Sequence, residues 1–257
     1  MKGKIDPIRG KYFDPLESAE SWFRWLFYVT AAVAVTVLLI DKQTCAFAYT
    51  VLQILFAILT IATSVLSVCM RLYLGSRAHR SRVADFLSRA FTVDLTAERT
   101  EKYYNSNAID PARRMILQLL ENCFFTKDIA RLMCRRSRTT AAIYLVVLIA
   151  AIIFRRTPID VTVVLCQVVF GEAVLSAWFR LEWLRMAAER IYDATYKQFK
   201  TLSGDTPFQM ASAIEALLDY ECHKASASIT LASGIFDENN RRLSSEWEVI
   251  RERLESG

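Results

Sequence analysis

The stretch TCAFAYTVLQILFAILTIATSVLSVCM, from Thr44 to Met70, holds 27 residues without a charged side chain. About 20 mostly apolar residues cross the hydrocarbon core of a bilayer as a helix. The stretch contains neither glycine nor proline, and a helix satisfies its own backbone hydrogen bonds inside lipid. It therefore predicts a membrane-spanning helix. The basic, helix-compatible sequence from Arg71 to Phe91 predicts that this helix continues out of the bilayer as an arm, with Gly75 as a kink.

Three further apolar blocks accompany this one, at Trp25–Ile40, Thr139–Phe154 and Val161–Phe179. The first two of them have 16 residues each, close to the lower limit of about 17 residues for a span. Flanking tryptophans and arginines can extend both by anchoring in the interface. We predict an all-α membrane protein with four transmembrane helices arranged as two hairpins. The second and fourth helices extend into a helical cytoplasmic domain.

The basic side chains indicate the orientation. Five Lys/Arg precede the first predicted span, 14 lie between the second and third, and 10 follow the fourth, out of 32 in the chain. Lysine and arginine concentrate on the cytoplasmic side of membrane proteins. Both termini are therefore expected in the cytoplasm.

These boundaries divide the chain into five parts. They are an N-terminal cytoplasmic segment (1–14), a first hairpin (15–70), an arm with a basic middle segment (71–138), a second hairpin (139–179), and an arm with C-terminal helices (180–257). Asp-Pro dipeptides, typical of helix starts, predict helices beginning at Asp14-Pro15 and at Asp110-Pro111. The second is expected to be short, ending near Glu121, with Thr126 capping the next helix.

The two arms resemble each other at an offset of 108 residues, which indicates an internal repeat. The matching positions are Arg77, Arg82, Asp85 and Phe91 with Arg185, Arg190, Asp193 and Phe199. Chance matches between amphipathic helices are the alternative explanation. Duplicated halves do recur among membrane proteins.

The order of hairpin, arm, middle segment, hairpin, arm and terminal helices resembles the SMODS-associated four-transmembrane family of pore-forming effectors, which is related to the SLATT domains. Two local stretches carry the resemblance further: ENCFFTKDIARLMC (121–134), and DYECHK (219–224) followed by IFDENNRRLSSEW (235–247). The resemblance implies a multi-pass effector in the bacterial inner membrane, acting in antiphage defence. It also implies control by a nucleotide or short oligonucleotide from an associated nucleotidyltransferase.

A polar stripe marks one face of the second predicted span. Gln53, Thr60, Ser64 and Ser67 recur at helical spacing, and such residues can line a water-filled pore in an oligomer. Ordinary helix packing, which also uses small and hydroxyl-bearing residues, is the alternative. In the fourth predicted span, Gln167 and the deeply placed Glu172 are further candidates for pore lining. Glu172 could instead be paired between packed helices.

Candidate ligand-binding residues lie in the middle segment, which has 14 basic against seven acidic residues. Arg113 and Arg114 sit at a predicted helix start, where backbone amides and guanidinium groups favour phosphate. Tyr103 and Tyr104 precede them and could stack on a base, and a buried pair of rings is the alternative. Arg77, Arg80 and Arg82 complete the set, although contact with anionic lipid also explains their position beside the membrane. A salt-bridged surface pair is the alternative for Arg113 and Arg114.

Enzyme signatures are missing, since neither a nucleophile elbow nor a zinc, P-loop or dinucleotide motif occurs. The six cysteines have no metal-ligand spacing, so no catalytic residue, metal or cofactor is predicted. The sequence is interpreted as a homo-oligomeric pore, with a tetramer favoured, surrounded by membrane lipid and gated by a nucleotide ligand. The alternative is a membrane-anchored scaffold or sensor that recruits a cytoplasmic partner.

Overall fold

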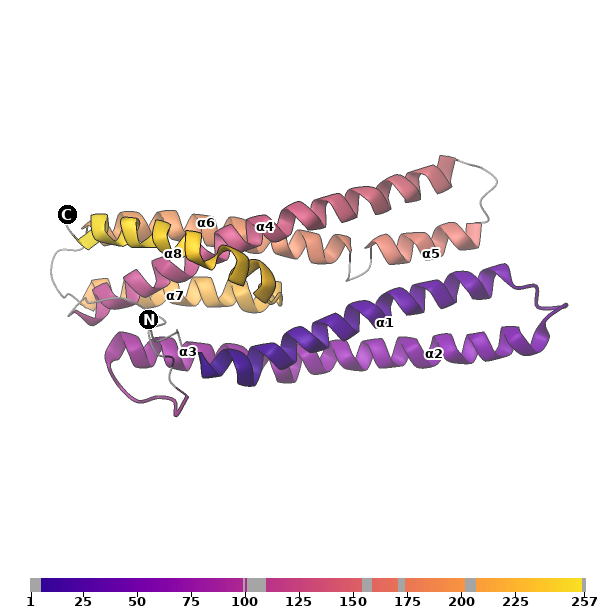
Figure 1. Cartoon of the computed structure of the whole chain (residues 1–257), viewed down its shortest axis with the longest axis horizontal. Helices are drawn as coiled ribbons and strands as arrows, with labels where there is room; N and C mark the ends of the chain where they lie inside the picture. Colours follow the sequence, from indigo (N-terminus) through magenta and orange to yellow (C-terminus); the bar gives the residue numbers. More distant parts are fainter. Residues whose placement is uncertain are drawn as a thin grey trace. The chain divides into compact units, whose positions relative to one another are not determined.

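The computed structural model describes residues 6–98, 100, 110–153, 159–170, 174–201 and 207–255. Helices and their connections make up these residues, and no strand occurs among them. The order is η1 (Arg9–Phe13), α1 (Asp14–Leu39), α2 (Ala46–Cys69), η2 (Met70–Gly75), α3 (Ser76–Phe91), α4 (Pro111–Ile153), α5 (Ile159–Phe170), α6 (Leu175–Thr201), α7 (Pro207–Ala227) and α8 (Ser233–Glu255), where η marks a π-helical turn (Figure 1). The prediction of an all-α protein is confirmed for the described part of the chain.

The chain divides into two compact units. The hairpin unit comprises Pro15–Gly75 and Arg135–Phe179, and the arm unit comprises Met1–Asp14, Ser76–Cys134 and Arg180–Gly257. Three helical stretches are long and apolar enough to cross a membrane, namely Arg9–Leu39, Ala46–Phe91 and Pro111–Ile153. This is a membrane protein by the length and composition of its helices.

The predicted continuation of the second apolar stretch as a further helix is confirmed. Helix α2 passes through η2 into α3, so that Ala46–Phe91 is one helical stretch. The predicted kink residue, Gly75, ends the π-helical turn. A Cβ atom at this position would lie 3.0 Å from the carbonyl oxygen of Met70. Gly75 thus permits the close backbone approach within this wider turn.

Helix α1 begins at Asp14, where the sequence predicted a helix start, but Asp14 is not an N-cap, because the helical backbone already begins at Pro7 and passes through η1. The oxygen Oδ1 of Asp6 accepts a hydrogen bond from the backbone N–H of Arg9 at 3.0 Å, and Pro7 follows as the first helical residue. Asp14 instead has helical backbone angles. Pro15 lies within the helix and donates no backbone hydrogen bond, directly after the π-helical turn η1. The N-terminal region offers two Asp-Pro dipeptides, Asp6-Pro7 and Asp14-Pro15, and the first is the cap.

Asp110 caps α4 as predicted, because its two carboxylate oxygens accept the N–H groups of Ala112 and Arg113, each at 3.1 Å. The expectation of a short helix ending near Glu121 is wrong, since α4 runs unbroken to Ile153 over 43 residues. Thr126 is not a cap. Its buried hydroxyl lies 2.7 Å from that of Tyr220 on α7, so tertiary packing uses the group that the sequence pattern assigned to a helix start.

The fourth predicted span, Val161–Phe179, is not one continuous helix in the described residues. Helix α5 ends at Phe170 and has 12 residues, about 18 Å at 1.5 Å per residue, and α6 begins at Leu175. Gly171 and Glu172 fall in the interval 171–173, which lies outside the described residues. The helical arm predicted after this span is present as α6.

The core of the arm unit joins α3, α4, α6, α7 and α8. Its largest contribution comes from one side of α4, where Met115, Ile116, Leu119 and Leu120 are fully buried. Leu243 and Trp247 of α8 and Ile191 and Phe199 of α6 pack on the same cluster. This core holds α6 and α8 beside α4 and so positions the groove described below.

Candidate functional site

A cavity of about 230 Å³ lies in the hairpin unit between α1, α2 and α5. It gathers three of the residues predicted to line a pore, Thr60 and Ser64 from α2 and Gln167 from α5. Eight further residues complete the lining: Phe27, Thr30, Ala31, Ala34, Phe56, Thr63, Val164 and Val168. A volume of this size has room for several water molecules, each of which takes about 30 Å³ in the liquid. Two residues of the polar stripe, Thr60 and Ser64, therefore face a space whose lining is mostly apolar but includes polar groups from three helices.

The threonine hydroxyls at this cavity donate to their own helices. Thr30, Thr60 and Thr63 bond the carbonyl oxygens of the residues four positions earlier, at 2.7, 2.8 and 2.7 Å. Each hydroxyl oxygen retains lone pairs that can accept from water or solvate a cation. The cavity wall is thus mostly apolar, with a few polar groups that carry no charge.

The opposite face of α2 is apolar and uncovered in the single chain. Ile54, Ile58, Ile61, Val65 and Val68 are each more than half exposed, and α2 has no buried residue. Lipid or another copy of the chain fits such a surface.

The other predicted pore residues lie apart from this cavity or cannot be placed. The amide of Gln53 donates to the hydroxyl of Tyr49 at 3.0 Å on an exposed part of α2. Ser67 is half-buried near the end of α2. Glu172 lies outside the described residues, as do Tyr103 and Tyr104.

The predicted phosphate site at Arg113 and Arg114 consists of two guanidinium groups engaged with helix ends. Arg113 donates to the carbonyl oxygen of Leu254 at 3.5 Å, and its guanidinium lies 4.6 Å from the ring centre of Phe199. Arg114 donates to the carbonyl oxygen of Ala90 at 3.3 Å and to the hydroxyl of Thr92. These contacts satisfy carbonyl groups at the carboxyl ends of α8 and α3, where positive charge is favourable.

The three arginines predicted beside the membrane lie on α3. Arg82 donates to Asp6 at 2.8 Å and lies 5.3 Å from the ring centre of Phe13, and Arg77 lies over the ring of Tyr12 at 5.7 Å. Both arginines hold the N-terminal segment against α3. Arg80 is exposed on the same helix.

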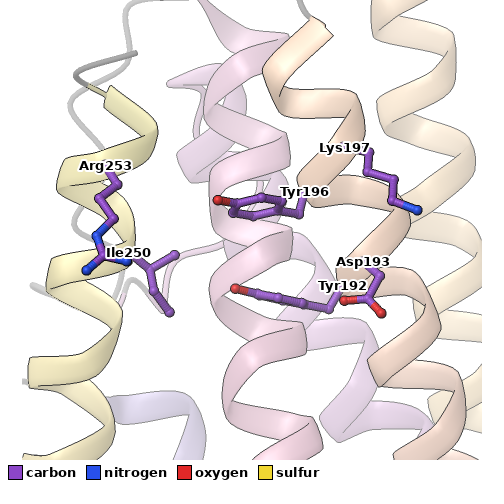
Figure 2. Close-up of a pocket in the computed structure, with 6 residues that line it drawn as sticks. All are labelled: Tyr192, Asp193, Tyr196, Lys197, Ile250 and Arg253. Carbon is purple, nitrogen blue, oxygen red and sulfur yellow. The ribbon is translucent and has the colours of Figure 1, made fainter.

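Figure 2 shows a groove between α6 and α8 that the sequence analysis did not select. Its volume is about 320 Å³, and Tyr192, Asp193, Tyr196, Lys197, Ile250 and Arg253 line it. Tyr192 and Tyr196 extend from α6 toward α8, one ring above the other, while Asp193 and Lys197 form the outer rim of α6 (Figure 2). Ile250 and Arg253 form the wall on α8.

Two lysines accompany the stacked tyrosine rings of this groove. The ring centres of Tyr192 and Tyr196 are 6.1 Å apart with 26° between the planes. The ammonium nitrogen of Lys127, on α4, lies 3.6 Å from the ring centre of Tyr192, and that of Lys200 lies 4.9 Å from the ring centre of Tyr196. Such distances allow cation–π attraction. Burial raises the pKa of Tyr192 to about 12, with the neighbouring Tyr196 and Asp193 acting in the same direction, so its hydroxyl stays protonated at neutral pH. We call these four residues the Lys–Tyr column.

A signal for this groove was present in the sequence. Tyr192, Tyr196 and Lys200 are spaced by four residues, which places them on one face of a helix. The partners on α8 come from about 55 positions later and could not be paired with them by spacing. Comparisons of the chain with protein-family models, with curated proteins and with solved structures found no match.

Proposed function

We propose that this protein is a membrane effector whose copies assemble, as a tetramer, into an ion-conducting pore gated by a nucleotide or short oligonucleotide at the arm unit. Opening depolarises the bacterial inner membrane and aborts infection by a phage. The chain crosses the membrane four times, and both termini face the cytoplasm. The ligand is the product of an associated nucleotidyltransferase, as the resemblance implies.

The observation that carries the proposal is the cavity lined by Thr60, Ser64 and Gln167 in the hairpin unit. Polar groups at membrane depth are costly unless they meet partners or water, and these three lie on two different helices around one space. Because no described residue of the lining is charged, the proposed pore discriminates weakly between ions. The uncovered apolar face of α2 supports assembly with further copies.

Continuous helices support the coupling between ligand and pore. The stretches Arg9–Leu39, Ala46–Phe91, α4 and α6 all run through the boundary between the arm unit and the hairpin unit. A change in the packing of α4 against α6 within the arm unit therefore acts on helices that continue into the hairpin unit. The ligand shifts the gate only by its difference in affinity between the open and closed states.

Ion flux from liposomes that contain the purified protein tests the proposal. The variants Thr60→Val and Ser64→Ala remove polar groups from the cavity, and we expect both to lower the flux. Thr50→Val is the matched control, since Thr50 is an exposed residue of α2 that makes the same hydrogen bond to its own helix and does not line the cavity. Vesicles that stay impermeable at high protein density, with and without nucleotide, would contradict the pore.

A membrane-anchored scaffold or sensor is the second candidate. The region after Phe179 has 13 acidic and 10 basic residues, and α8 exposes much of this charge, including Arg241, Arg242 and Glu246. Such a surface suits a polar partner. An impermeable vesicle that recruits a cytoplasmic protein through α8 would favour the scaffold over the pore.

A further inference from the structure

We infer that the groove between α6 and α8 is a binding site for a nucleoside phosphate, with the base on the tyrosine rings and the phosphate at Arg253 and Lys197. This inference rests on the proposed function and names the site at which the ligand acts.

The tyrosine pair provides the surface for the base. Base–aromatic stacking tolerates any base, because every base has a π face. Tyr192 and Tyr196 are half-buried, so their orientation is held by packing while part of each ring remains accessible in the groove (Figure 2). Ile250 on the opposite wall adds an apolar contact for the edge of a base.

The charges around the groove match a phosphate. Lys197 lies on its α6 rim and Arg253 on its α8 wall, and Lys200 lies over the ring of Tyr196. Among the lining residues, two cations stand against one carboxylate, that of Asp193. An arginine can bind phosphate through two parallel hydrogen bonds. The volume of about 320 Å³ lies at the lower end of the range of about 300–1,000 Å³ for small-molecule sites.

The first arm indicates a role for Asp193. At the matching position of the repeat, Asp85 is fully buried and accepts two hydrogen bonds from Thr100, from its backbone N–H at 3.2 Å and from its hydroxyl at 2.7 Å. Asp193 is exposed at the rim of the groove. As a carboxylate at the rim, Asp193 can accept hydrogen bonds from the ribose hydroxyls of a nucleoside.

The Lys–Tyr column links the site to the rest of the chain. Lys127 belongs to α4, whereas Tyr192, Tyr196 and Lys200 belong to α6. A base that stacks on these rings competes with the ammonium groups for the ring faces. Occupancy of the groove therefore changes the contact between α4 and α6, two of the helices that continue into the hairpin unit.

Calorimetric titration of the full-length protein in detergent with ATP, pyrophosphate and adenosine tests the inference. We expect ATP to bind at least about tenfold more tightly than either fragment. Tyr196→Leu should weaken ATP binding about tenfold and leave pyrophosphate binding nearly unchanged, whereas Tyr196→Phe should retain ATP binding because it retains the ring. Arg253→Gln should weaken both ATP and pyrophosphate.

The matched control is Arg242→Gln, which removes an exposed arginine of α8 that pairs with Glu246 outside the groove. Thermal unfolding of each variant checks that the fold is intact. Absence of ATP and pyrophosphate binding at millimolar concentration, or ATP affinity unchanged by both Tyr196→Leu and Arg253→Gln, would overturn the inference. The titration needs no membrane, so it tests the site separately from the pore. ATP binding without ion flux would contradict the pore and support the site. Ion flux without ATP binding would support the pore and contradict the site.

Discussion

The hydroxyl oxygens of Thr126 and Tyr220 lie 2.7 Å apart in the core of the arm unit, and both side chains are buried. This contact joins the middle of α4 to α7 across 94 positions of sequence. Each hydroxyl gives the other a hydrogen-bond partner. A buried hydroxyl without a partner would destabilise the fold, because it loses its hydrogen bonds to water.

Removing one of these hydroxyl groups should destabilise the arm unit. We expect Tyr220→Phe to lower the free energy of unfolding by about 1–2 kcal/mol, because Thr126 loses its buried partner. The double variant with Thr126→Val should cost less than the sum of the two single changes. Thermal unfolding in detergent measures the effect, and strictly additive losses would show that the two groups do not interact.

The position of the N-terminal cap predicts unequal roles for two aspartates. Asp6 accepts the N–H of Arg9 at 3.0 Å and the guanidinium of Arg82 at 2.8 Å. Asp6→Ala should therefore cost about 1–3 kcal/mol of stability. Asp14 has helical backbone angles and its carboxylate lies 3.8 Å from Arg9, so Asp14→Ala should change stability by less than about 0.5 kcal/mol. Equal effects in unfolding measurements would contradict the cap assignment.

His79 predicts a loss of stability in acid. Burial, with a smaller contribution from the charge of Lys224, lowers its pKa from 6.5 to about 4, against the opposing effect of Glu221. Between these pH values the unfolded chain binds a proton that the folded chain does not, so the free energy of unfolding falls as the pH falls from 6.5 to 4. The full effect is at most about 3 kcal/mol, at about 1.4 kcal/mol per pH unit.

The variant His79→Phe isolates this contribution. It keeps an aromatic ring beside Phe13, whose ring centre lies 6.3 Å from that of His79, and it removes the titrating group. Unfolding temperatures recorded from pH 7 to pH 4 should then decline less steeply than in the original chain. A variant whose decline is as steep would show that other groups cause the pH dependence.

The cysteines offer a test of the proposed four-span topology. Cys45 lies between α1 and α2 and Cys222 lies on α7, and both are exposed. In intact spheroplasts a membrane-impermeant maleimide should label Cys45 and spare Cys222, whereas opened membranes should show labelling of both. Cys123 serves as the control, since burial raises its pKa and should keep it unreactive throughout. Labelling of Cys222 in intact spheroplasts would place α7 on the outer side.

Local patterns predicted some helix ends correctly and others wrongly. Asp110-Pro111 begins α4 as expected, because an aspartate before a proline supplies acceptors for the first free N–H groups. Asp14-Pro15 carries the same pattern, but the helix has already begun at Pro7. Thr126 likewise has a capping side chain in the interior of α4. A cap pattern indicates only that the side chain is able to accept hydrogen bonds from the backbone. The structure of the adjacent residues determines whether a helix begins there.

The candidate sites, too, were predicted only in part from the sequence. Helical spacing placed Thr60 and Ser64 on one face of α2, and Gln167 joins them only because α5 packs beside that face. Arg113 and Arg114 were predicted to bind phosphate because of their position at a helix start, yet their side chains turn to the ends of two other helices. Sequence spacing did not predict the groove on α6, because its second wall comes from α8.

The sequence alone determined that this is a helical membrane protein, because a run of 27 uncharged residues has only one stable arrangement in lipid and carries its own hydrogen bonds. The distribution of its 32 basic residues along the chain can likewise be read without a tertiary structure. The tertiary structure alone decided which side chains meet: Lys127 with Tyr192, and Thr126 with Tyr220. These pairs are separated by more than 50 positions, and only the packing of the shared core brings them within contact distance.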